Sequence, residues 1–263
     1  MIFWHHLVPV LLVPAGVLPF LGRFEKGLHF WGAFGLAALA ATAWTAAQFS
    51  NSWPTGFGPA IWLTVSACLV LFLILSLLVP EFWRLGAILG PWILVMAVLA
   101  LAWNQAETPR SPGIDSVSEW IGLHVVLSVT TYVFLTMAAI AGLAVILQER
   151  SLKRRRPDRL APLLPSLADC ERLEIRLLVT SEIILAAGIA TGLAATSTAD
   201  VIAGMNHKIV FTVAAFAVIA MLLVARQLWG TRGRRAARLV LTGYLLMTLA
   251  YPGVKFVTDV IIG

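Results

Sequence analysis

Apolar runs of a length that fits a lipid bilayer recur along the whole chain. A helix needs about 20 apolar residues to cross the hydrocarbon core. Eight such runs lie at residues 2–21, 29–49, 59–79, 84–103, 120–147, 174–197, 208–228 and 237–261. They are continuously apolar and do not alternate, which argues against a β-barrel. The pattern predicts an all-α polytopic membrane protein, a bundle of about eight transmembrane helices.

The eight runs fall into two halves of four, within residues 1–103 and 118–263, and we expect one integrated membrane domain built from both. The first run contains Pro9, Pro14 and Pro19, too many prolines for a regular helix. It lacks a basic n-region and a small-residue cleavage site, so we expect a retained span and not a cleaved signal peptide.

The composition supports the membrane assignment. Of the 263 residues, 60% are hydrophobic and 12% are charged, against about 45–50% and about 25% in soluble domains. So few charges cannot cover the surface of a soluble globule or keep a chain disordered. The net charge of +6 could indicate a protein that binds nucleic acid. The positions of the basic residues decide whether it does.

Basic residues gather in two loops between the apolar runs, 148–172 and 226–238. By the positive-inside rule both loops face the cytoplasm, and the alternation of eight spans then places both termini outside. All but three of the 19 lysines and arginines fall on the cytoplasmic side; the exceptions are Arg110, Lys208 and Lys255. The positive charge therefore sets the orientation of the protein in the membrane. We expect the basic side chains to contact anionic membrane lipids, and we expect no nucleic-acid partner.

The cysteines and the missing sequence motifs exclude several activities. Cys68 lies within a span and Cys170 in a cytoplasmic loop, so the two cannot form a structural disulfide. The chain has no Cys-x-x-Cys, which excludes a thiol-disulfide carrier and a c-type cytochrome. It has no Walker A motif, so it does not hydrolyse ATP alone. We predict that the protein is not an enzyme.

A polar stripe crosses the fifth predicted span. Trp120, His124, Ser128 and Tyr132 are spaced four residues apart and therefore share one helix face. Lipid cannot satisfy polar side chains, so we expect the stripe to face the bundle. Trp120 belongs either to the interfacial aromatic belt or to an apolar platform for a porphyrin.

Four of the five histidines fall near the outer face in the predicted orientation: His5, His6, His124 and His207. The fifth, His29, lies at the inner end of its span. Neutral imidazole is a good axial ligand of haem iron, and His124 and His207 lie on different helices that could clamp one iron. The alternatives are an interhelical hydrogen bond for His124 and an interfacial position for His207. His5 and His6 are adjacent, so at most one of them could join the same site.

Other polar or small residues at membrane depth have simpler explanations. Gly188 and Gly192 form a Gly-x-x-x-Gly pair that permits close helix packing. Lys255 and Asp259 are four residues apart and can pair with each other. Glu182, about two turns into the sixth span, needs a partner or a proton, and a proton or ion role stays open for it.

The second half of the chain resembles a known family. The first segment that carries the resemblance consists of Ser118, Trp120, His124, Val125, Ser128 and Tyr132. It is similar to the segment S-x-W-L-x-x-H-V…S-Y of the cytochrome c assembly (CcsA/CcmC) superfamily. The motifs that follow resemble its YpjD/HemX-like branch. They are Leu164-Pro-Ser-Leu167, Leu173-Glu174, Ala187-Gly188, Thr191-Gly192, Asn206-His207-Lys208-Ile-Val-Phe211, Trp229-Gly-Thr-Arg-Gly-Arg-Arg235 and Tyr251-Pro-Gly253-Val-Lys255-Phe256.

The resemblance implies a haem site in the bacterial inner (cytoplasmic) membrane. In that superfamily, histidines near the outer face ligate haem, which is passed to apocytochrome c. Carried over to this chain, His124 ligates the iron of haem b, and Trp120, Ser128 and Tyr132 border the cofactor. His207 as the second ligand is a conjecture specific to this sequence. Other cytochrome c assembly or membrane subunits are the implied partners.

Three functions follow, in order of preference. The first is an inner-membrane accessory protein for cytochrome c biogenesis and haem handling that binds haem near the outer face. The second is a haem-free regulatory or structural subunit that docks a partner through its cytoplasmic basic loops. Residues 198–208 favour it, because they lack the tryptophans of haem-delivering relatives. The third is an ion-coupled transporter using Glu182, which the lack of an evident inverted repeat disfavours.

Overall fold

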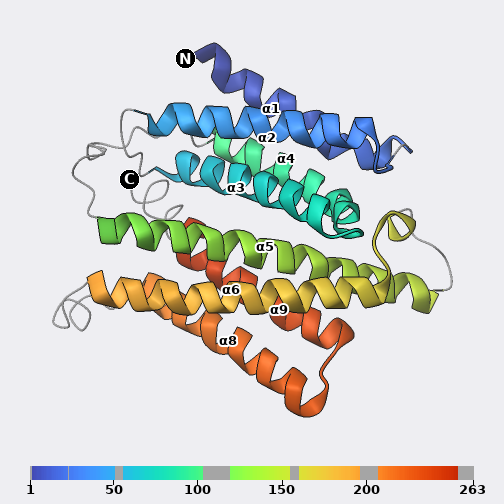
Figure 1. Cartoon of the computed structure of the whole chain (residues 1–263), viewed down its shortest axis with the longest axis vertical. Helices are drawn as coiled ribbons and strands as arrows, with labels where there is room; N and C mark the ends of the chain where they lie inside the picture. The colour runs from blue at the N-terminus through green and yellow to red at the C-terminus, as the bar shows by residue number, and fades with distance from the viewer. Residues whose placement is uncertain are drawn as a thin grey trace. The chain divides into compact units, whose positions relative to one another are not determined.

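The structure is a computed structural model that describes residues 2–22, 24–50, 56–102, 119–154, 160–195 and 207–253 (Figure 1). These residues form eight α-helices: α1 (Ile2–Val17), α2 (Leu28–Phe49), α3 (Phe57–Leu78), α4 (Gly86–Ala102), α5 (Glu119–Arg154), α6 (Leu167–Ala195), α8 (His207–Trp229) and α9 (Gly233–Thr248). The short helical turns are η1 (Leu18–Phe20), η2 (Phe82–Leu85), η4 (Ala161–Leu163) and the π-helical η5 (Leu249–Gly253).

The predicted all-α polytopic membrane protein is confirmed, and within the described residues each predicted apolar run overlaps a helix. In the part of the chain that the structure describes, five helices are long and apolar enough to cross a membrane: Leu28–Phe49, Phe57–Leu78, Phe82–Ala102, Gly122–Arg154 and Ile209–Trp229. A shorter apolar helical stretch covers Leu7–Phe20. Among the described residues there is no β-strand.

The two predicted basic loops are largely helical, which corrects the loop boundaries. Helix α5 continues to Arg154 and α6 begins at Leu167, so only 155–166 remain between them; α9 begins at Gly233. The hydropathy of the sequence predicted that each helix ends where its apolar run stops. Lysine and arginine are nevertheless good helix formers, and Lys153 and Arg154 in the last turn of α5 favour the negative end of its dipole.

The expectation of an irregular first span was also wrong. Helix α1 runs through Pro9 and Pro14 without interruption. Proline removes one backbone hydrogen bond, but membrane helices tolerate it where neighbouring helices compensate. Val8, Leu12 and Ala15 form a buried stripe on α1, and the packing of α1 against α2 and α4 stabilises the helix despite the prolines.

Residue contacts divide the chain into two compact units. The first contains α1 to α4 together with η4. Helix α1 packs against α2 and α4, and α3 packs against the same two helices, so the four form a closed ring. Gly90 of α4 allows the closest crossing, since a Cβ atom at this position would lie 3.2 Å from the Cα of Gly16 and still closer to the carbonyl oxygen of Ala15.

An aromatic core fills the first unit. Phe30, Phe34 and Phe72 are fully buried, and their ring centroids lie 4.9 Å (Phe30 to Phe34) and 5.0 Å (Phe34 to Phe72) apart. Trp62 is also fully buried in α3. Gly86 at the start of α4 makes room for two of these rings, because a Cβ atom there would lie 3.0 Å from Cζ of both Phe34 and Phe72.

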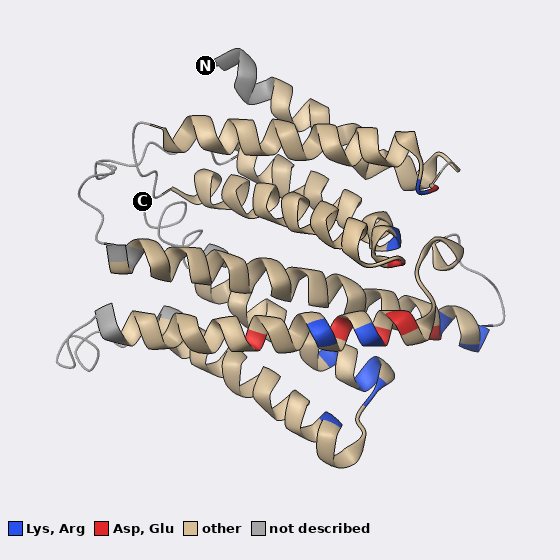
Figure 2. Ribbon diagram, in the orientation of Figure 1, with Lys and Arg blue, Asp and Glu red and all other residues tan. Residues whose placement is uncertain are grey.

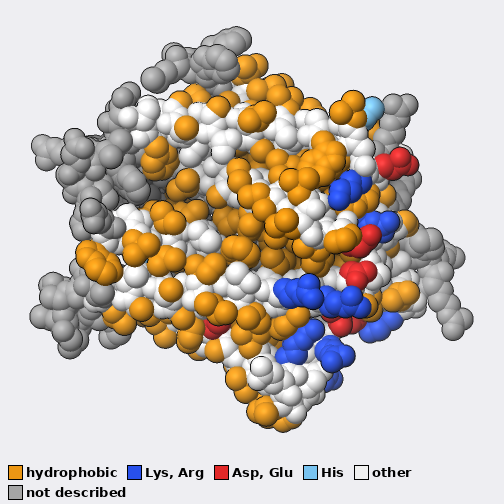
Figure 3. All heavy atoms as spheres, in the orientation of Figure 1, with side chains coloured by type: hydrophobic (Ala, Val, Ile, Leu, Met, Phe, Trp, Pro, Cys, Tyr) orange, Lys and Arg blue, Asp and Glu red, His pale blue; other side chains and the backbone are white. Residues whose placement is uncertain are grey.

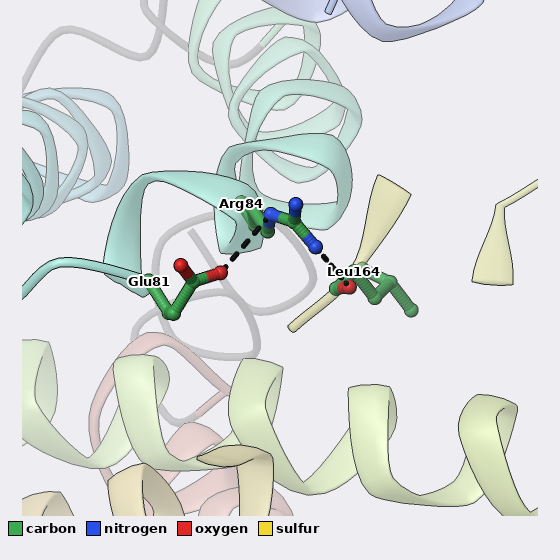
Figure 4. A network of polar contacts seen from close by, with 3 residues as sticks. All are labelled: Glu81, Arg84 and Leu164. Atoms are coloured by element: carbon green, nitrogen blue, oxygen red, sulfur yellow. Dashed lines mark hydrogen bonds and ion pairs between the residues drawn. The ribbon is translucent and has the colours of Figure 1, made fainter. Parts of the chain in front are cut away.

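Arg84 holds the segment before α6 within the first unit (Figure 4). Its Nε atom lies 3.1 Å from Oε2 of Glu81, and its Nη1 donates a hydrogen bond of 3.3 Å to the carbonyl oxygen of Leu164. One guanidinium therefore joins η2 to the residues that follow η4.

The second unit contains α5 as far as Glu149, then α6, α8, α9 and η5. Helices α8 and α9 pack along each other, and α6 packs against both. The buried face of α9 is made of small and aliphatic residues: Gly233, Ala236, Ala237, Val240, Gly243 and Met247. At Gly243 a Cβ atom would lie 3.0 Å from Cγ1 of Ile219, so the absent side chain lets α8 and α9 approach closely.

Charged side chains of the second unit gather at one end of its helices, where α5 and α8 end and α6 and α9 begin (Figure 2). Glu174 is 1% exposed and lies 3.9 Å from Nη1 of Arg226. Glu149 of α5 accepts a hydrogen bond of 2.9 Å from the backbone N–H of Arg234, at the N-terminus of α9. This charge asymmetry agrees with the pattern behind the predicted orientation, which itself stays a prediction.

Replacing Gly90 tests the α1–α4 crossing. Gly90→Ala would force α1 and α4 apart, and we expect the free energy of unfolding to fall by about 1–3 kcal/mol. Gly32→Ala and Gly35→Ala on α2 are matched controls, because a Cβ atom meets nothing within 4 Å at either site. Thermal unfolding in detergent is the measurement, and equal loss of melting temperature in all three variants would contradict the close crossing.

The buried ion pair gives an asymmetric prediction. Arg226→Gln leaves the nearly inaccessible carboxyl of Glu174 without its cation, whereas Glu174→Gln leaves Arg226, which is 17% exposed and can reach solvent. Losing one partner of a buried pair costs about 3–5 kcal/mol. We therefore expect Arg226→Gln to lower the melting temperature more than Glu174→Gln does. The reverse order would show that the pair does not hold α6 to α8.

Candidate functional site

The predicted polar stripe of α5 separates into two parts. His124, Ser128 and Tyr132 line a common cavity within the second unit. Trp120, one turn nearer the start of α5, is 57% exposed and is not among the residues that line the cavity. The helix face that the four-residue spacing predicted is therefore turned inward over three of its four positions.

His124 is held by the backbone of α6. Its Nδ1 lies 3.0 Å from the carbonyl oxygen of Gly188 and 3.4 Å from Oγ1 of Thr191. A carbonyl oxygen can only accept a hydrogen bond, so the contact with Gly188 requires the proton on Nδ1. The Nε2 atom then carries the lone pair. This is the arrangement by which metal-binding histidines are usually oriented.

Gly192 leaves the space that the imidazole ring of His124 occupies. A Cβ atom at Gly192 would lie 2.9 Å from Cε1 and 3.3 Å from Nδ1 of His124. At Gly188, one turn earlier, a Cβ atom would make only an ordinary contact of 3.9 Å with Leu127. The Gly-x-x-x-Gly pair therefore does more than bring two helices together, since its second glycine leaves the space that the histidine ring occupies.

The cavity has a volume of about 340 Å³ and is bounded by all four helices of the second unit and by η5. Seven of its 15 lining residues carry apolar, non-aromatic side chains: Leu185, Ile189, Leu193, Ile209, Val213, Met247 and Ala250. The lining includes no Asp, Glu, Lys or Arg from the described part of the chain. An imidazole in a largely apolar cavity can bind a flat apolar ligand or a metal centre that such a ligand carries.

Two hydroxyls of the stripe are already used by the protein. Ser128 donates a hydrogen bond of 2.7 Å to the carbonyl oxygen of His124. The hydroxyl of Tyr132 lies 3.0 Å from Oγ1 of Thr248 and 3.4 Å from the hydroxyl of Tyr244. The Ser128 hydrogen bond therefore stays within α5, whereas Tyr132 ties α5 to α9.

The other predicted ligand, His207, is the first residue of α8, and its side chain lies outside the described residues. Ile209, two positions further along, lines the cavity. The side chains of His5 and His6, together with Lys255 and Asp259, also lie outside the described part of the structure, whereas His29 is exposed on α2.

Glu182 is buried in α6 at 8% exposure, and neither carboxyl oxygen has a hydrogen-bond partner among the described residues. It lies three positions before Leu185, which lines the cavity. The Glu182 side chain itself does not line the cavity, so the two features are separate.

Both cysteines are buried and neither forms a disulfide. Burial, reinforced by the charge of Asp169, raises the pKa of the Cys170 thiol to about 12. The thiol therefore stays protonated at neutral pH and supplies no thiolate.

Several cavity residues escaped the sequence reading. Met247 of α9 was predicted only as part of an apolar span, and Tyr251 of η5 only as part of a motif that resembles the family, with no role at the site. The backbone carbonyl of Gly188 carries no side-chain signal at all. The nearest clue in the sequence was the Gly188/Gly192 spacing, which indicated a close helix contact but not its partner.

The fold and the site define a class of protein. It is a multi-pass helical membrane protein whose apolar cavity is bordered by His124. A family model described as "Cytochrome C assembly protein" matches residues 28–262. The chain therefore belongs to the cytochrome c assembly family, and membership supports a role in cytochrome c biogenesis. The match confirms the resemblance drawn from the second half and extends it into the first.

One curated relative is similar over nearly its whole length. It is an uncharacterized 28.8 kDa protein in the nifR3-like 5' region of Azospirillum brasilense, 44% identical over 262 residues. The alignment covers 96% of this chain and 95% of the relative. No solved structure matches the chain.

The tautomer of His124 can be measured directly. In protein with ¹⁵N-labelled histidine, we expect the His124 resonances to show a protonated Nδ1, because Gly188 accepts that proton. Gly192→Ala should shift these resonances by displacing the ring. The matched control Gly188→Ala should leave them unchanged. A protonated Nε2 in the parent protein would exclude the proposed hydrogen bond.

Proposed function

We propose that the chain is an inner-membrane accessory protein of cytochrome c biogenesis that binds haem near the outer membrane face, with His124 as an axial ligand. The observation that carries the proposal is the hydrogen bond from Nδ1 of His124 to Gly188, which leaves Nε2 free to bind a metal. The proposal takes haem b as the simplest form of the cofactor and assigns the chain to the YpjD/HemX-like branch of its family.

The residues around the cavity fit such a group. Imidazole is a common axial ligand of haem iron. The aliphatic wall suits a porphyrin face, whose burial is driven by the hydrophobic effect. Ligand pockets range over about 300–1,000 Å³, and the cavity lies near the lower limit at about 340 Å³. It would enclose part of a haem, and the described lining offers no cation that would pair with the charged propionates.

The second axial position has more than one candidate. His207 is proposed because it is the first residue of α8, the helix whose first two turns line the cavity through Ile209, Thr212 and Val213. Met247 and Tyr251 line the same cavity and also carry side chains that ligate haem iron in other proteins. We keep His207 as the proposed second ligand.

The chain's own residues bind and orient in this proposal. Gly188 fixes the tautomer, Gly192 gives the ring its space, and the Tyr132 hydrogen bond to Thr248 holds α5 against α9. Haem, when bound, supplies a redox-active iron centre. The protein holds and presents the cofactor without turning over a substrate, and other assembly subunits in the membrane are its proposed partners.

A haem-free regulatory or structural subunit is the second candidate. It is favoured by residues 198–208, which contain no tryptophan. Such a subunit would dock a partner through its cytoplasmic basic segments. Protein that stays free of haem after expression in haem-replete cells, and that co-purifies with a partner, would favour this candidate over the first.

Haem content after replacement of His124 tests the proposal. We expect His124→Ala to lower the Soret absorbance per mole of purified protein by at least roughly tenfold. Loss of a residue that only orients a metal ligand already lowers metal affinity by about this factor. The control is His29→Ala, because His29 is exposed on α2 in the other unit. Full retention of the Soret band in His124→Ala would refute the site, and equal loss in both variants would indicate a general folding defect.

A further inference from the structure

The outward face of α9 changes from basic to apolar along its length. Arg235, Arg238, Thr242, Leu245 and Leu249 are all exposed and follow one another at intervals of three or four residues. Residues with this spacing lie on one stripe of a helix. The stripe is basic near the start of α9 and aliphatic near its end.

Further exposed arginines lie beside the basic end of this stripe. Arg232 precedes α9, and Arg172 and Arg176 lie in the first turns of α6. Oε1 of Glu171 would lie 3.7 Å from a Cβ atom at Gly233, so the beginnings of α6 and α9 are neighbours. We name Arg172, Arg176, Arg232, Arg235 and Arg238 the basic patch. Figure 3 shows Lys and Arg side chains gathered over this end of α6 and over the α8–α9 turn, bordered by hydrophobic side chains.

The protein leaves most of this positive charge uncompensated. Arg172 lies 3.6 Å from Asp169, in an exposed pair. No hydrogen bond or ion pair joins the other four guanidinium groups to a residue that the structure describes. Of the carboxylates at this end, Asp169 pairs with Arg172, Glu174 faces Arg226 and Glu149 caps α9, whereas Glu171 lies beside Gly233.

The surroundings of the basic patch match the boundary between lipid headgroups and acyl chains. Leu228 and Trp229 end α8 at 68% and 76% exposure, and tryptophan is enriched at membrane interfaces. Arg238 and Leu245 are seven positions apart, which corresponds to about 10 Å along the helix axis. The distance suits a helix face that passes from the headgroup layer into hydrocarbon. Arginine side chains can also extend from an apolar surface to reach the headgroups.

We propose that the basic patch is a binding site for an anionic phospholipid. The guanidinium groups of Arg235 and Arg238 contact its phosphate, because a guanidinium matches a phosphate with two parallel hydrogen bonds. Arg172, Arg176 and Arg232 add positive charge around the headgroup. The acyl chains lie along Leu245 and Leu249. The site is distinct from the His124 cavity and does not depend on haem binding.

Lipid retention measured by native mass spectrometry tests this proposal. The full-length protein is equilibrated with equal amounts of phosphatidylglycerol and phosphatidylcholine in detergent, and the bound lipids are counted. We expect the parent protein to retain phosphatidylglycerol preferentially, and R235Q/R238Q to lose about tenfold or more of that preference, as expected for two charges near the headgroups. R235K/R238K keeps the charge and should stay within about threefold of the parent.

The matched control is K153Q/R154Q, which removes the same charge from exposed positions at the end of α5 and should retain the parent preference. Equal loss in this control would overturn the proposal in favour of a general effect of net charge. Equal retention of the two lipids by the parent protein would also overturn it. Should R235Q/R238Q fail to fold, T242R adds a guanidinium to the same stripe, and the proposal requires a stronger preference for phosphatidylglycerol.

Discussion

The hydrogen bond between Nδ1 of His124 and the backbone carbonyl of Gly188 is the interaction on which the site depends. It joins α5 to α6 inside an apolar environment, where an unpaired imidazole N–H would be costly. It also decides which ring nitrogen keeps a lone pair. The bond can form only because Gly192 has no side chain where the ring lies. One backbone carbonyl and one missing Cβ atom thus turn an ordinary core histidine into a potential iron ligand.

The charged residues at one end of the second unit help to fix the alignment of α5 with α6. Gly142 of α5 lies against Glu174 of α6, since a Cβ atom there would be 2.8 Å from Oε1 of Glu174. Glu174 faces Arg226 of α8, and Glu149 caps α9. Together with the His124–Gly188 contact, these interactions fix the antiparallel α5–α6 pair at both ends. A shift of one residue would rotate the polar stripe by about 100° away from the cavity.

Hydropathy predicted the helices because a bilayer imposes one length and one polarity on every span. The four-residue spacing likewise placed His124, Ser128 and Tyr132 on the face that lines the cavity. Trp120 has the same spacing but is exposed. Its placement depends on how far the neighbouring helices extend beside the first turn of α5, and spacing within one helix carries no such information.

The remaining parts of the site could not be read from local pattern. Met247 and Tyr251 reach the cavity from a segment more than 100 residues beyond His124, so their contribution depends on tertiary packing. Gly188 acts through its backbone, which every residue possesses. The charged helix ends were misjudged for a related reason, since hydropathy marks where a membrane span stops and says nothing of where the helix stops.

The most direct test of iron ligation by His124 is chemical rescue. His124→Gly removes the ring and leaves its space, so free imidazole can take the place of the side chain. After haemin is added to this variant in nanodiscs, we predict an absorption spectrum that differs from that of the parent protein and returns to it as imidazole is added. An unchanged spectrum in His124→Gly, or no return with imidazole, would contradict ligation of the iron by His124.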